Sequence, residues 1–294
     1  GCASGTDALL MALMALDIGP GDAVFTSPFT FIATAEVISL LGATPVFVDI
    51  DPKTYNIDPD KLDRAITALQ AKDPSRRPPS LRPRAIIPVD LFGLTADYDA
   101  IDAVAKKHNL LVIEDAAQSF GAEYKGRKSC SFGRIACTSF FPAKPLGCYG
   151  DGGMCFTNDD AVALQLDSIR VHGKGSHKYD NARIGINGRL DTLQAAVLLA
   201  KFDIFPEEVE LRQEAAGRYS RLLEGHKTIT TPHVPAGYRS AWAQYSILAK
   251  DETHRSVLQK RLQENKIPTA IYYPKPLHLQ TAFAGLGYKP GDFP

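Results

Sequence analysis

The feature that most constrains the fold is an alternation of short apolar runs with longer amphipathic segments over the first 115 residues. The short runs predict buried strands at residues 22–26, 44–48, 85–89 and 110–114. The segments between them predict helices at residues 31–41, 58–69 and 96–108. This alternation indicates an α/β fold with a mostly parallel central sheet and helices on both of its faces. In such a sheet, ligands bind at the carboxyl ends of the strands.

The second half of the chain has a different pattern. A long charged segment predicts a helix at residues 207–223, followed by a strand at 242–249, a helix at 253–264 and a strand at 269–273. We therefore expect a large domain at residues 1–205 and a smaller C-terminal α+β domain at 206–294. The sequence begins without Met, so we expect the large domain to be truncated at its N-terminus. A segment rich in Pro and Arg at residues 72–84 predicts a surface loop.

Composition excludes several classes of function. Lys and Arg number 33, as do Asp and Glu, and the resulting zero formal charge argues against nucleic-acid or anionic-membrane binding. No uncharged apolar run reaches the roughly 18 residues of a membrane span. The five cysteines form no C-x-x-C pair and have no metal-ligand spacing with histidine, so we expect free thiols in the cytoplasm and no bound metal.

A single lysine stands out in the segment TSFFPAKPLGCYGDGGM at residues 138–154. Lys144 lies between an aromatic pair, Phe140 and Phe141, and a glycine-rich turn. An amine among apolar groups loses hydration, so its pKa falls and it becomes a nucleophile able to form a Schiff base. An arbitrary lysine at this place would instead extend its amine from a strand end into water. The rest of the chain decides between these two interpretations.

The remaining parts of a pyridoxal phosphate (PLP) site can also be found. Such a site needs a lysine, a carboxylate at the pyridine nitrogen, an aromatic ring against the cofactor face and a phosphate cup. Asp115 follows the apolar run LLVIE at a strand end, and Gln118 lies three residues later, within reach of the ring oxygen. The candidate for the ring contact is Phe31, and the candidates for the phosphate cup are Gly5, Thr6 and Ser139. Each has a structural alternative, namely a helix cap, a salt bridge or a core aromatic, so the prediction depends on their agreement at one sheet edge.

Several segments resemble the signature segments of the DegT-type nucleotide-sugar aminotransferases, which are fold-type I PLP-dependent enzymes. They are ASGTDAL, TFIATAE, DIDPKTYNIDP, VIEDAAQSFGA, SFFPAKPLGCYGDGG and GINGRLDTLQAAVL. The resemblance extends from Gly1 to about Pro276, and it implies that the small domain is incomplete, because members of the family continue past Pro294. It implies that Lys144 carries PLP, Asp115 pairs with the pyridinium and Gln118 contacts the ring oxygen.

The resemblance also implies a set of contacts beyond the cofactor ring. Phe31 stacks on the ring, and Thr6 and Ser139 bind the phosphate. The family is dimeric with a shared site, which implies that Asn187 reaches the neighbouring subunit's phosphate. The residues implied to bind substrate are Arg189, Tyr272 and Tyr273. Tyr272 stands where the most similar branch commonly has histidine.

The activity implied by the resemblance is amino transfer from glutamate to a keto group of a nucleotide-linked sugar. The most similar branch aminates UDP-2-acetamido-2-deoxy-3-oxo-glucuronate for surface polysaccharides such as lipopolysaccharide. Alternatives are a 4-keto-6-deoxy nucleotide sugar as substrate or a non-catalytic regulatory protein with the PLP fold. Lys144 argues against a same-fold dehydratase, which has histidine there. The absence of G-x-G-x-x-G after a strand argues against an NAD-linked reductase.

Overall fold

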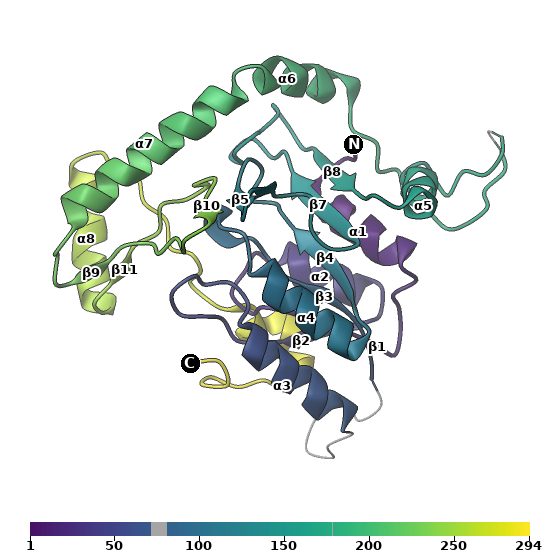
Figure 1. The fold of residues 1–294 in the computed structure, drawn as a ribbon, viewed down its shortest axis with the longest axis horizontal. Coiled ribbons are helices and arrows are strands. Elements are labelled where there is room, and N and C mark those ends of the chain that lie inside the picture. The colour runs from purple at the N-terminus through teal and green to yellow at the C-terminus, as the bar shows by residue number, and fades with distance from the viewer. Residues whose placement is uncertain (72–80, 178) are drawn as a thin grey trace.

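The computed structural model describes residues 1–71, 81–177 and 179–294, and its centre is a six-stranded sheet (Figure 1). The strand order is β2-β1-β3-β4-β7-β8, parallel throughout except for β8, which is antiparallel to β7. The strands are β1 Asp22–Thr26, β2 Thr44–Phe47, β3 Arg82–Ile87, β4 Leu111–Asp115, β7 Ile135–Ser139 and β8 Gly153–Phe156. This is the mostly parallel central sheet predicted from the sequence.

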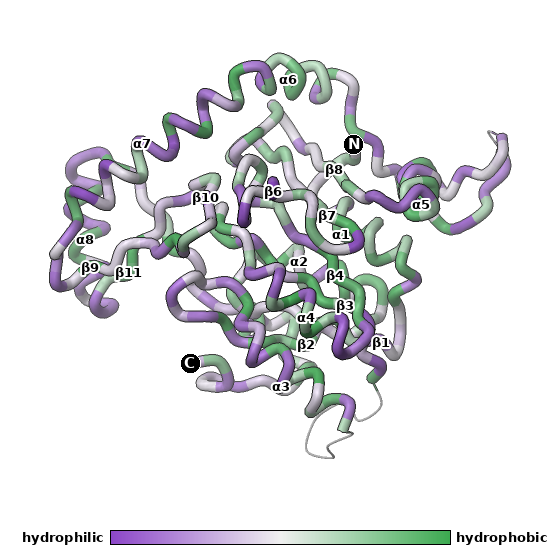
Figure 2. Tube along the Cα trace, in the orientation of Figure 1, coloured by the Kyte–Doolittle hydropathy of each residue, from purple (hydrophilic) through white to green (hydrophobic). Residues whose placement is uncertain are grey.

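Helices cover both faces of the sheet, as the alternation predicts. They are α1 Gly5–Ala15, α2 Ala33–Leu40, α3 Pro59–Gln70, α4 Tyr98–His108 and α5 Asp160–Arg170. Val24 and Ile87 pack with α1, α2 and α5 on one face, whereas their neighbours Phe25 and Ile86 pack with α3 and α4 on the other. This division follows from the strand geometry, because successive side chains point to opposite faces. Figure 2 shows the hydrophobic residues concentrated in the central strands and in α1.

The second half of the chain arches away from the sheet before returning to it (Figure 1). Its elements are α6 Thr192–Phe202, α7 Phe205–Leu223, β9 Ile229–Thr230, β10 Tyr238–Arg239, β11 Leu248–Ala249 and α8 Glu252–Glu264. β9 pairs with β11, and β10 extends a small sheet formed by β5 Glu123–Tyr124 and β6 Arg127–Lys128. Leu277 and Phe283 then pack against Phe47 beside the main sheet. The domain boundary at residues 205 and 206 stays a prediction.

Two strand predictions in the second half are wrong. Of residues 242–249, only Leu248 and Ala249 form a strand, and residues 269–273 form none. The start of this segment instead bonds to the turn at Phe92 and Gly93. The Ala241 N–H donates to the Gly93 carbonyl at 2.8 Å, and the Gln244 N–H donates to the Phe92 carbonyl at 3.4 Å. Backbone groups committed to a turn cannot also form a sheet ladder.

The loop predicted at residues 72–84 is only partly testable. Residues 72–80 lie outside the described residues, and from Arg82 onward the prediction is wrong because β3 has already begun. Arg82 is fixed at the start of β3 by its ion pair with buried Asp22, at 2.7 Å. Within the described residues, no helix combines the length and apolar composition that crossing a bilayer requires.

Candidate active site

The carboxyl ends of two neighbouring parallel strands form the centre of the candidate site. Asp115 is the last residue of β4, and Ser139 is the last residue of β7. Both line a small pocket together with residues from the starts of α1 and α2. The pocket is lined by Gly5, Thr6, Leu9, Thr30, Phe31, Ala33, Thr34, Val89, Asp115, Ala117, Gln118, Ser139 and Lys144. The seven residues predicted to bind the cofactor from within one subunit therefore share one pocket, although their roles stay predictions.

Asp115 is a buried carboxyl group with specific donors. The Thr34 hydroxyl donates to Oδ2 at 2.8 Å, and the Ala117 N–H donates to Oδ1 at 3.2 Å. Burial raises the pKa of Asp115, while these two donors and the charge of Lys144 act in the opposite direction. A carboxyl group in this environment is stabilised as an anion by a cation placed in the pocket, such as a protonated pyridine nitrogen.

Lys144 has the desolvated amine that its sequence context predicts. Burial lowers the pKa of this amine, and the carboxylate of Asp115 opposes that shift. The glycine-rich turn after Lys144 is held by α6. The Lys201 ammonium donates to the Gly147 carbonyl at 2.5 Å, and the Tyr149 N–H donates to Gln194 Oε1 at 2.8 Å. The amine is thus carried on a turn that another helix fixes in place.

The orientation of Gln118 is fixed by a strained turn. Its Oε1 accepts the Phe92 N–H at 2.6 Å, which leaves Nε2 as a donor, 3.5 Å from the Tyr273 hydroxyl. Phe92 has a φ of 59°, a left-handed conformation that is uncommon for a large side chain. Tyr273 is largely buried beside Gln118, and burial is the main cause that raises its pKa to about 12. Gln118 can therefore present an amide donor to a ring oxygen.

The first turn of α1 meets Ser139 at the pocket. A Cβ atom on Gly5 would lie 2.6 Å from Ser139 Cβ, so only glycine allows this close approach. The Ser4 side chain caps the helix by accepting the Asp7 N–H at 3.0 Å. Other N–H groups of the first turn lack helical partners and lie at the positive end of the helix dipole. This arrangement suits an anion such as a phosphate.

The other predicted site residues differ in how close they lie to the pocket. Phe31 lies at the pocket with a 57% exposed side chain, and Tyr272 is 40% exposed and packs beside Tyr273. Asn187 and Arg189 are exposed and do not line the pocket. Their backbones bridge instead to Val171 and Cys2, respectively.

Sequence reasoning did not identify Thr34 or Phe92 as contributors. Thr34 contacts Asp115 directly, and Thr30 extends that contact, with 3.2 Å between the two hydroxyl oxygens. Thr30 precedes α2, which begins at Ala33, so helical periodicity gave no signal for this pair. No sequence signal identifies Phe92, because it contributes through its backbone.

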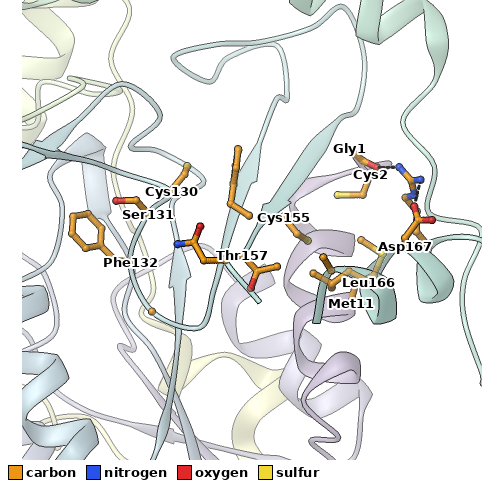
Figure 3. Close-up of a pocket in the computed structure, with 15 residues that line it drawn as sticks. Gly1, Cys2, Met11, Cys130, Ser131, Phe132, Cys155, Thr157, Leu166 and Asp167 are labelled. Atoms are coloured by element: carbon orange, nitrogen blue, oxygen red, sulfur yellow. Dashed lines mark hydrogen bonds and ion pairs between the residues drawn. The ribbon is translucent and has the colours of Figure 1, made fainter. Parts of the chain in front are cut away.

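A second pocket lies along edge strand β8 and is drawn in Figure 3. It is lined in part by Cys2, Cys130, Cys155 and Thr157. None of the predicted site residues belongs to its described lining. It is therefore a separate feature of the molecule.

Comparison with known proteins identifies the family. A model of the DegT/DnrJ/EryC1/StrS aminotransferase family matches residues 1–294. The chain belongs to this family. It is 51% identical over 283 residues to the UDP-2-acetamido-2-deoxy-3-oxo-D-glucuronate aminotransferase of Pseudomonas aeruginosa, covering 96% of this chain and 74% of that protein. It is 48% identical over 297 residues to the pleiotropic regulatory protein of Geobacillus stearothermophilus, covering 100% of this chain and 75% of that protein.

A solved structure of this aminotransferase family agrees closely. The Brucella abortus DegT/DnrJ/EryC1/StrS aminotransferase superposes with a TM-score of 0.93 at 53% sequence identity, covering 100% of this chain and 76% of that one. The family, the fold class and the enzyme class expected from the sequence are confirmed. The PLP cofactor is confirmed as that of the family, whose structures include PLP and PMP forms.

The residues of the pocket fit that cofactor. The amine of Lys144 and the buried carboxyl of Asp115 influence each other's charge across the pocket. Gln118 supplies a donor, and the close approach of Gly5 to Ser139 leaves backbone N–H groups for a phosphate. Groups able to serve as a covalent attachment point, a partner for a ring nitrogen, a ring-oxygen donor and an anion cradle thus occur in one pocket.

Proposed function

We propose that this aminotransferase moves an amino group from glutamate to a keto group of a nucleotide-linked sugar, UDP-2-acetamido-2-deoxy-3-oxo-glucuronate. The observation that carries the proposal is the meeting of Lys144 and Asp115 in one buried pocket. The 51% identity to the Pseudomonas aeruginosa enzyme supports this sugar. The proposal assigns the protein to surface polysaccharide synthesis in the cytoplasm, and its five free thiols suit a reducing compartment.

The side chains of the pocket divide the chemistry between them. When bound, PLP supplies an electron sink for the substrate carbon that loses a proton. Lys144 attaches the cofactor and, once free, holds and returns that proton, since burial brings its pKa closer to neutrality. Asp115 holds a positive charge at the inner end of the pocket. Gln118 orients the ring through its fixed amide donor.

Arg189 is the proposed determinant of substrate class. Its planar guanidinium can bind the carboxylate of a uronate with two parallel hydrogen bonds, which the ammonium of lysine cannot do. A 4-keto-6-deoxy sugar has no carboxylate, so Arg189→Lys should reduce turnover of the uronate more than that of the neutral sugar. The measurement is the rate at which the amine-loaded enzyme reacts with each sugar class. Faster reaction of wild type with the neutral sugar would reject the uronate assignment and leave the aminotransferase assignment intact.

We also propose a homodimer in which Asn187 and Arg189 serve the partner subunit's site. Both side chains are exposed and outside the pocket of their own chain. The neighbouring helix α6 exposes the apolar side chains Leu193 and Leu199, at 80% and 72%, which suits a protein contact. Mixing Lys144→Ala with Arg189→Ala subunits should restore activity, because each hybrid dimer would carry one intact site. Hybrid dimers that form but stay inactive would contradict the shared site.

A non-catalytic regulatory role is the second candidate, favoured by the 48% identity to the pleiotropic regulatory protein. The presence of Lys144, Asp115, Gln118 and Ser139 in one pocket favours catalysis instead. An absorbance spectrum separates the two. We expect a yellow protein that loses its colour when glutamate is added, and colour unchanged by glutamate would favour the regulator.

A further inference from the structure

Two carboxyl groups are completely buried behind the candidate site. Asp90 and Glu114 are both 0% exposed, and their carboxyl groups lie within hydrogen-bonding reach of each other. Glu114 directly precedes Asp115 in β4, so its side chain points to the opposite face of the sheet. The pair is outside the lining of the cofactor pocket, and the mechanism does not use it.

The donors that Asp90 accepts from lie around the start of α4 and directly after Gln118. Its Oδ1 accepts the Ala96 N–H at 2.9 Å and the Tyr98 hydroxyl at 2.8 Å, and its Oδ2 accepts the Ser119 hydroxyl at 2.7 Å. The Asp90 N–H donates to the Asp115 carbonyl at 3.0 Å. Asp90 therefore ties the residue after Gln118 to the end of β4.

Asp90 also begins the turn that holds the Gln118 side chain. The Gly93 N–H donates to the Asp90 carbonyl at 3.4 Å, which encloses Phe92 in the turn. The Phe92 N–H is the donor that fixes Gln118 Oε1. Asp90 thus supports Gln118 from two sides, through Ser119 and through the Phe92 turn.

Glu114 holds the segment on its other side. Its Oε1 accepts the Cys130 N–H at 2.7 Å, and its Oε2 accepts the Phe132 N–H at 2.8 Å. The titratable groups that interact with the pair are Tyr98 of α4 and Cys130 of this turn, and both become anions when they ionise. Within the described residues, neither carboxyl group forms an ion pair with a lysine, arginine or histidine, and the largest influences on their pKa values include no cation.

Two adjacent buried carboxylates without a cation would have a high free energy if both were charged, because each loses its hydration and repels the other. A single proton between them removes one charge and supplies a hydrogen bond. We propose that Asp90 and Glu114 share one proton and that this pair positions Gln118 from behind the cofactor pocket. The positioning part of the proposal rests on the proposed contact between Gln118 and the cofactor, whereas the shared proton does not.

Asp90→Asn is the decisive variant for the shared proton. Its Oδ1 can still accept from Ala96 and Tyr98, and its amide N–H replaces the shared proton as a permanent donor to Glu114. The amide nitrogen cannot accept the Ser119 hydroxyl as Oδ2 does, so this one bond is lost in the variant. Infrared difference spectra at neutral pH, with the full chain, should show the loss of one protonated-carboxyl band relative to wild type. Asp22→Asn is the matched control, because that carboxyl is equally buried but is paired with Arg82 at 2.7 Å. An unchanged band in Asp90→Asn would overturn the shared proton.

Unfolding by urea at several pH values gives a second readout. Burial raises the pKa of Asp90 to about 6, and it raises the pKa of Glu114 well above its ordinary value. Stability from these groups is therefore fully present below their unfolded-state pKa values and is lost as pH rises through the folded-state values. Asp90→Asn should lose less stability between pH 5 and pH 8 than wild type or Asp22→Asn. An equal loss in all three proteins would overturn the proposal.

A double-mutant cycle tests the positioning role. Asp90→Ala should speed cofactor loss by up to about tenfold, the scale of one net hydrogen bond. Combined with Gln118→Ala, it should add little, because it acts through Gln118. Ser119→Ala replaces Asp90→Ala if that variant fails to fold, since it removes only one bond of the network. Independent, additive effects would show that Asp90 does not act through Gln118, and this result would leave the infrared test and the proposed function standing.

Discussion

The hydrogen bond from Thr34 to Asp115 gives the sharpest single prediction about the candidate site. Thr34→Val replaces a hydroxyl by a methyl group of similar size. The lost bond joins Thr34 Oγ1 to Asp115 Oδ2 at 2.8 Å, and both residues are buried. The carboxylate then keeps the Ala117 N–H as its remaining donor in the described structure, so its charged form becomes less stable.

The size of the effect follows from the type of bond. A hydrogen bond to a charged group contributes about 1.5–3 kcal/mol, so losing it raises the pKa of Asp115 further. Asp115 already has a raised pKa, so its contribution to stability is lost as pH rises. Thr34→Val extends that loss to higher pH, and the stability difference from wild type should widen between pH 5 and pH 8. Cofactor affinity should fall about tenfold to a hundredfold, because a less ionised carboxyl holds a cation weakly.

The assay combines urea unfolding of the cofactor-free protein with a titration of cofactor binding followed by absorbance. Thr34→Ser is the matched control, since it keeps the hydroxyl and should stay close to wild type in cofactor affinity. Thr30→Val is a second control that removes only the outer contact, at 3.2 Å. If Thr34→Val and Thr34→Ser bound cofactor equally well, the hydroxyl would not support the charge of Asp115 and the reasoning would be refuted.

Three further predictions concern other parts of the site. Lys144→Ala should lose the covalently held cofactor, and borohydride reduction followed by peptide mass mapping of wild type should find cofactor mass on Lys144 and on no other lysine. Asp115→Asn should fold but react orders of magnitude more slowly, because an amide cannot hold a positive charge; turnover near wild type would make the carboxylate structural. Lys201→Met should speed cofactor loss severalfold by releasing the Gly147 carbonyl, whereas Lys201→Arg should largely preserve retention; equal retention in both would contradict a role for this contact.

Much of the site was predictable because strand ends are visible in sequence. Asp115 follows an apolar run, and ligands bind at the carboxyl ends of parallel strands. Ser139 was found by its place five residues before Lys144. Lys144 was identified by its apolar and glycine-rich neighbours, and Gly5 by its place before an apolar helix. These features depend on local sequence, which is why the sheet order was not needed to find them.

The contacts that tune the site depend on packing between distant segments. Thr34 is 81 residues from Asp115, and Phe92 bonds to Gln118 through its backbone N–H, whose direction depends on a positive φ. The strand predicted at residues 242–249 is mostly absent for the same reason. The Gln244 N–H and the Ala241 N–H just before the segment bond to the turn at Phe92 and Gly93, a partner that sequence periodicity does not reveal.

Helix α6 contacts the turn that follows Lys144, and it also carries the surface proposed to meet a partner subunit. Gln194 and Lys201, seven residues apart on one side of α6, bond to the turn that follows Lys144. Leu193 and Leu199 are exposed on the same helix and form the surface proposed to meet a partner subunit. A shift of α6 therefore reaches the turn beside Lys144 through two hydrogen bonds. In the proposed dimer, packing between the subunits would then influence the placement of Lys144 within each subunit. It would also influence Asn187 and Arg189, which are proposed to contact the partner subunit's site.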